Sequence, residues 1–136
     1  MRLYHVDIAR FAANADQKWV DNLLSHFDVP GVYGGRQGVP RRIAAEGIYH
    51  IALVRRLHRE LGLGVSDAVS LATTLLSTGG GQFSLGDRLA LHFDGAGFRL
   101  SIDAAIADGV ESVVPARRGR PPVSRRAEPA SGESSE

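Results

Sequence analysis

Residues 6–27 constrain the fold most, because their pattern is typical of two short helices joined by a tight turn. Asp7 and Asp16 are each predicted to cap a helix, since a carboxylate can accept hydrogen bonds from the exposed N–H groups. Asn14 lies between two alanines and predicts the turn, because Asn adopts left-handed backbone angles at low cost. Helical spacing predicts an inward apolar set: Ile8, Phe11, Trp19, Leu23 and Phe27.

The second of these helices carries polar residues on its outer side. A helix-turn-helix that binds DNA needs a buried joint and a second helix whose side chains reach base edges. The residues in position to do this are Gln17, Lys18, Asp21 and Asn22. The sequence therefore predicts a DNA-reading helix in this segment.

A short hairpin is predicted after this segment, because Pro30 and Gly31 stop the helix. Two β-prone pieces, 32–33 and 39–43, flank the glycine-rich residues 34–38, and Pro40 is expected to confine its strand to a sheet edge. Beside a helix-turn-helix, such a hairpin would be a wing whose arginines bind phosphates: Arg36, Arg41 and Arg42. The alternative is a surface loop with an ordinary charge cluster.

Two further helices are predicted, one over 46–61 and one beginning after Ser66 or Asp67, its expected cap. Gly62 is expected to end the first. The pair should pack together and supply most of the core. One side of the first helix is expected to be basic and to include Ala52, Arg55, Arg56 and Arg59.

The region after Thr78 is predicted to hold a glycine-rich break, a hairpin and a short helix. Residues 89–94 and 98–103 alternate in hydropathy around the turn-like 94–97. Asp103 can then cap a last helix over 104–113. The expected fold class is α+β, mainly α, in three parts: residues 1–77, 78–114 and 115–136.

The last part is expected to be a disordered tail, since Pro, Ser, Gly, Arg and Glu dominate it. Its segment Arg118-Gly119-Arg120-Pro121 is similar to the core of an AT-hook. That resemblance implies that Arg118 and Arg120 extend along an A·T-rich minor groove. Non-specific phosphate contact and a solvated or partner-binding tail are the alternatives.

Composition narrows the functional classes. The net charge of the 136 residues is only +1, but arginines cluster in 36–59 and 115–126, which favours patches for a polyanion over arginines that are merely solvated. There is no cysteine, no metal-binding histidine spacing and no nucleophile motif, so no metal, cofactor or enzyme activity is predicted. Without a long apolar run, we expect a cytoplasmic protein with no membrane association.

The order of these elements resembles the DNA-binding domain of the MerR superfamily over residues 4–76. The resemblance rests on small Ala9 and Ala13, core Trp19, the run 41–43 in the hairpin, and Leu-Gly-Leu-Gly-Val-Ser at 61–66. It implies Gln17 and Lys18 near bases, with Arg36, Arg41 and Arg42 on phosphates. The family's Arg-Tyr-Tyr-Glu run is replaced by Val20-Asp21-Asn22, and no long dimerisation helix is expected. Metal and drug sensing are therefore not implied.

These features together predict a sequence-specific regulator that binds double-stranded DNA as a homodimer, either a repressor or a DNA-binding antitoxin. One alternative is a protein–protein adaptor, in which the later hairpin and the acidic segment 84–111 bind a partner such as a toxin. Another is a nucleoid protein that binds DNA through its tail.

Overall fold

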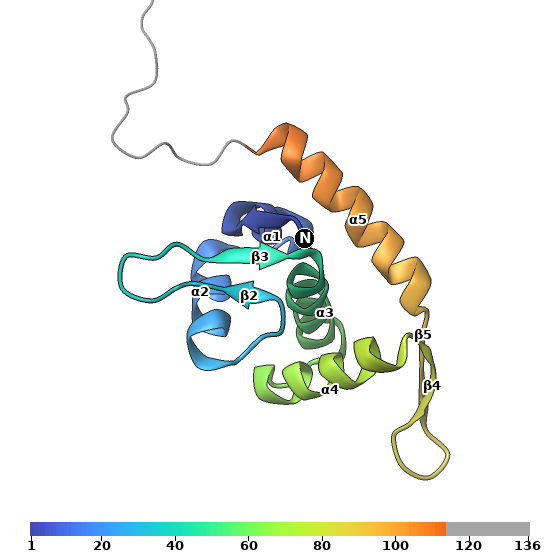
Figure 1. The fold of residues 1–136 in the computed structure, drawn as a ribbon. Coiled ribbons are helices and arrows are strands. Elements are labelled where there is room, and N and C mark those ends of the chain that lie inside the picture. The colour runs from blue at the N-terminus through green and yellow to red at the C-terminus, as the bar shows by residue number, and fades with distance from the viewer. Residues whose placement is uncertain (114–136) are drawn as a thin grey trace, which may run out of the picture.

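The mainly helical α+β class is confirmed by a computed structural model that describes residues 1–113 (Figure 1). The predicted tail lies outside the described residues. Within 1–113, five helices and five strands follow one another as β1 (Leu3–His5), α1 (Val6–Ala13), α2 (Gln17–His26), β2 (Val32–Tyr33), β3 (Arg42–Ala44), α3 (Ala45–Leu61), α4 (Val65–Thr78), β4 (Gly81–Ser84), β5 (Ala90–Phe93) and α5 (Gly95–Ser112).

The turn between α1 and α2 is as predicted. Asn14 has a left-handed φ of 53°, and the Asp16 carboxylate accepts a hydrogen bond from the Trp19 N–H at 2.8 Å. The predicted Asp7 cap is wrong, because α1 begins at Val6, two residues earlier than an Asp7 cap requires, and His5 is the cap. The His5 ring nitrogen accepts from the Asp7 N–H at 3.1 Å, and the Asp7 carboxylate binds Arg10 at 3.0 Å instead.

The first three strands form an antiparallel sheet in the order β1-β3-β2. The hairpin of β2 and β3 is confirmed, with Val32 opposite Ile43. β3 is the central strand, so the expected edge position is wrong. Pro40 lies outside β3, where its missing N–H removes no hydrogen bond from the sheet. Strand β1 was not predicted, because its three residues show too little alternation to indicate a strand.

Helix α3 lies at the centre of the core. Ile48, Ile51 and Val54 are almost fully buried, and α3 packs on α1, α4 and α5. Ala52 is only 2% exposed, so the predicted basic side that included it is wrong. The predicted end of α3 at left-handed Gly62 is confirmed. The expected Ser66 or Asp67 cap is wrong, because α4 begins at Val65 without a side-chain cap.

The C-terminal region differs most from the prediction. A hairpin forms, but the partner of β5 is β4, with Phe83 opposite Leu91, and not residues 98–103. Asp94, expected in a turn, instead caps α5 by accepting from the Gly97 N–H at 3.0 Å. The predicted short helix with an Asp103 cap is therefore wrong, because Asp103 lies inside a single 18-residue helix. No long helix was expected here, since residues 98–102 alternate as a strand would.

Helix α5 returns across α1 and α3 (Figure 1). Gly109 allows close contact, because a Cβ there would lie 3.0 Å from Phe11. Phe11, predicted to point inward, is 43% exposed beside this glycine. A polar cluster also ties α5 to the body of the protein. The Tyr49 hydroxyl donates to Asp103, and Arg99 binds Glu46 and the Leu76 carbonyl.

The polar cluster predicts a loss of stability at high pH. Burial, followed by the hydrogen bond and the negative charge of Asp103, raises the pKa of Tyr49 from 10.0 to about 12. The neutral phenol therefore stabilises the fold fully below pH 10, and this contribution is lost as the pH rises toward 12. The advantage of the wild type over Tyr49→Phe in unfolding free energy should shrink across this interval in denaturant titrations. Tyr33→Phe, which removes an exposed phenol from β2, is the control, and an equal change there would contradict the assignment.

Candidate nucleic-acid interface

Helix α2 presents a polar surface at its N-terminal end. Gln17, Lys18 and Asn22 are exposed, whereas Val20 and Leu23 anchor the opposite side of the helix in the core. The Asp16 cap and the left-handed Asn14 fix where this helix begins. Gln17 and Asn22 can both donate to and accept from base edges, and Lys18 can donate, which is the chemistry that reading a major groove requires.

The hairpin of β2 and β3 carries two exposed arginines. Arg36 lies in its tip, which is closed by a hydrogen bond from the Gly35 N–H to the Val39 carbonyl at 2.8 Å. Arg42 lies on β3, and its guanidinium donates to the Arg41 carbonyl at 3.2 Å. Both guanidinium groups remain accessible to a phosphate.

The structure joins this hairpin to α2 through Arg41. One of its terminal nitrogens lies 3.4 Å from the Asp21 carboxylate and the other donates to the Ser25 hydroxyl at 3.3 Å. The Arg41 side chain is only 23% exposed, and its stem lies against Gly35. In the free protein Arg41 therefore fixes the hairpin on α2 and balances the charge of Asp21. Ser25 was missed, although its spacing of four residues from Asp21 places both on one helix face.

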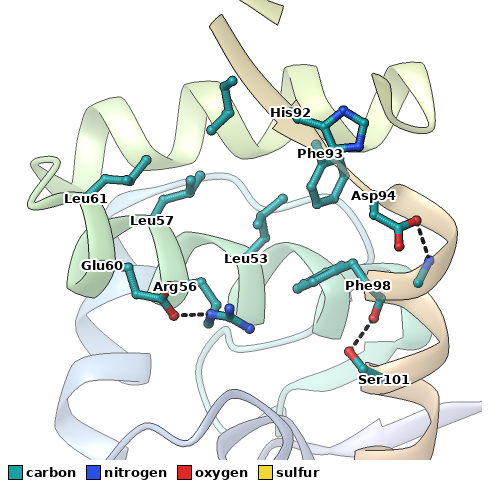
Figure 2. Close-up of a pocket in the computed structure, with 12 residues that line it drawn as sticks. Leu53, Arg56, Leu57, Glu60, Leu61, His92, Phe93, Asp94, Phe98 and Ser101 are labelled. Atoms are coloured by element: carbon teal, nitrogen blue, oxygen red, sulfur yellow. Dashed lines mark hydrogen bonds and ion pairs between the residues drawn. The ribbon is translucent and has the colours of Figure 1, made fainter. Parts of the chain in front are cut away.

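The two α3 arginines named as candidates point toward different elements. The guanidinium of Arg55 lies 4.8 Å from the centre of the Trp19 ring, where it covers the joint between α2 and α3. Arg56 forms an ion pair with Glu60 and lines a groove on the side of β5 and α5 (Figure 2). Successive helical residues are rotated by about 100°, which is why these neighbours separate. Of the two, only Arg55 is close to α2.

Arg118 and Arg120 lie outside the described residues. Val113, the last described residue, lines a surface pocket together with Asn14, Ala15 and Asp16. The described part of the chain thus ends beside the turn between α1 and α2.

Residues 1–113 contain isolated histidines and carboxylates and a few close pairs of them. No group of three or more His, Cys, Asp or Glu side chains in that range could hold a metal ion. Three of the histidine rings bond to main-chain carbonyls: His26 to Asn22, His50 to Glu46 and His58 to Leu63. Over the same range, every helix is too short or too polar to cross a membrane.

Comparison with known proteins found no family, curated protein or solved structure that matches this chain.

Proposed function

We propose that this protein is a sequence-specific, double-stranded DNA-binding transcriptional regulator with a winged helix-turn-helix, acting in the cytoplasm as a repressor or a DNA-binding antitoxin. The observation that carries the proposal is the link through Arg41. It holds an exposed polar helix end and a hairpin with two exposed arginines as one surface. The order of elements from α1 to α4, namely two helices, a hairpin and a helix pair, is the one on which the resemblance to the MerR superfamily rests and gives further support.

Each group has a separate role in this proposal. Gln17, Lys18 and Asn22 contact base edges, and Arg36 and Arg42 bind phosphates on the flanking backbone. Arg41 and Asp21 hold the hairpin at the angle that permits both contacts, and Arg55 supports Trp19 beneath α2. Arg56 lies on another side and contributes only to the electrostatic field of the protein.

Two copies are proposed to bind a site with two half-sites, because one such domain contacts too few base pairs for useful specificity. The tail arginines Arg118 and Arg120 are proposed to contact a minor groove beside each half-site. The position of Val113, the last described residue, beside the α1–α2 turn supports this placement. No cofactor is required for any of these contacts.

The proposal is tested by mobility shift on random duplex DNA at low salt, followed by enrichment of the bound sequences. We expect a shift at micromolar protein and a preferred sequence after enrichment. Gln17→Ala with Asn22→Ala should abolish the preference, at about 1–3 kcal/mol for each lost base contact, and retain non-specific binding. The absence of any shift at tens of micromolar wild-type protein would overturn the proposal.

A further inference from the structure

The β4–β5 hairpin has one apolar face. The core covers this face at the base of the hairpin but not at its tip. Its register pairs Phe83 with Leu91, and the Leu85 N–H donates to the Leu89 carbonyl at 2.7 Å, which extends the pairing toward the tip. Alternation places these four residues and Phe93 on one face. Phe93 is 9% exposed at the base, but Leu85 and Leu89 are 45% and 60% exposed at the tip. The hairpin projects away from the helices (Figure 1).

The base of the same hairpin borders an apolar groove of about 410 Å³. One wall is the end of α3, with Leu53, Leu57 and Leu61, and the other is formed by β5 and the start of α5 (Figure 2). Leu61, at the end of α3, is 52% exposed. The ion pair of Arg56 and Glu60 lies beside these leucines on α3.

We propose that a second copy of this chain covers both features, with the hairpin tip of each copy seated in the groove of the other. Tip and groove belong to the same molecule, so a two-fold axis makes the contact twice and closes the dimer. The four steps along the chain from Leu89 to Phe93 span about 13 Å at roughly 3.3 Å per residue. Two hairpins packed face to face in opposite directions therefore place each tip over the partner's base.

The charges at the two ends of this contact are complementary. The tip carries Asp87 and Arg88, whose side chains are 96% and 92% exposed, and the groove carries Arg56 and Glu60. In the dimer, Asp87 faces the partner's Arg56, and Arg88 faces the partner's Glu60. An isolated two-stranded hairpin is marginally stable in water, so burial of its apolar face against a second copy also stabilises the hairpin itself.

This inference deepens the proposed function, which places two copies on DNA, but its test needs no DNA. Light scattering or sedimentation over a concentration series should show that the wild-type full chain is a dimer. Leu85→Asp with Leu89→Asp on the tip, or Leu61→Asp in the groove, should raise the dissociation constant at least roughly tenfold. Leu100→Asp, at an α5 side chain that is 71% exposed and outside the groove, should leave it unchanged.

A charge reversal on exposed residues keeps the test independent of folding. Asp87→Arg with Arg88→Asp reverses the charges of the tip. Arg56→Glu with Glu60→Arg reverses the charges of the groove and retains the ion pair between these two helix positions. Each variant alone should be monomeric where the wild type is dimeric. An equimolar mixture of the two should form a heterodimer, because both of its contacts again join opposite charges.

Several results would overturn the inference. They are a monomeric wild type at submillimolar concentration, a dimer unaffected by the tip and groove variants, and a mixture that fails to associate. A groove that binds an apolar small molecule in a monomeric protein would also overturn it. A dimer that binds no DNA would refute only the proposed function, whereas a monomer that binds DNA would refute only the inference.

Discussion

Replacing Arg36 and Arg42 with alanine should weaken binding to every duplex by on the order of a hundredfold at low salt. A hydrogen bond to a charged group is worth about 1.5 kcal/mol or more, so each lost phosphate contact costs about tenfold. The slope of log K against log salt should fall in magnitude by about 1.8, because each contact contributes about 0.9. Both side chains are exposed on the β2–β3 hairpin, so their removal should leave the fold intact.

The control for this pair is Arg2→Ala with Arg59→Ala. It removes the same charge at two exposed positions that belong neither to α2 nor to the β2–β3 hairpin. Arg2 lines a pocket beside α5 and Arg59 lies in the last turn of α3. Fluorescence anisotropy over a series of salt concentrations measures both quantities. An equal loss of slope in the control would assign the effect to net charge, and a loss confined to one duplex would contradict phosphate binding.

Local signals account for what the sequence predicted well. The Asp16 cap, the left-handed Asn14 and the end of α3 at Gly62 each depend on a residue's own backbone preference or on a partner three residues away. These preferences depend only on residues close in sequence, so the tertiary structure does not change them. The exposed end of α2 follows from them, because the cap and the buried side of the helix together fix its outer face.

The pairing of Arg41 with Asp21 could not be predicted, because these residues are 20 positions apart and only the assembled sheet brings them together. From sequence alone, Asp21 was a carboxylate among the residues expected to reach base edges, and Arg41 was one of three equivalent arginines. The structure separates their roles. The Arg41 guanidinium contacts two side chains of α2, whereas Arg36 and Arg42 are exposed and can bind an anion.

The error in the C-terminal region has a different physical origin. Phe98, Leu100 and Ile102 alternate as in a strand, but Phe98, Ile102 and Ile106 also recur at helical spacing. Tertiary burial selects the helix, leaving Leu100 71% exposed while Ile102 and Ile106 enter the core. Strand β4 was missed because Gly79, Gly80 and Gly81 favour a break, although the strand itself begins at the third of these glycines.

Gly31→Ala should destabilise the protein by about 2–4 kcal/mol, because two unfavourable effects add at this position. Gly31 has a left-handed φ of 83°, which costs an L-residue about 1–2 kcal/mol. A Cβ would also lie 2.5 Å from the main-chain nitrogen of Gly47 in α3, an overlap of the kind that costs about 1–3 kcal/mol. The smaller conformational entropy of the unfolded variant offsets only about 0.4–1 kcal/mol. Denaturant unfolding monitored by circular dichroism measures the difference.

Gly38→Ala separates the two effects, since Gly38 has a similar φ of 73° but no heavy atom within 4 Å of an added Cβ. It should cost about 1 kcal/mol, the conformational part alone. Equal losses in the two variants would show that the contact with α3 contributes nothing. A larger loss at Gly31 would mean that this contact sets where β2 begins, since the Gly31 carbonyl also accepts from the Ala44 N–H at 2.8 Å. The position of Arg36 and Arg42 relative to α2 would then depend on Gly31, although Gly31 belongs neither to the β2–β3 hairpin strands nor to α2.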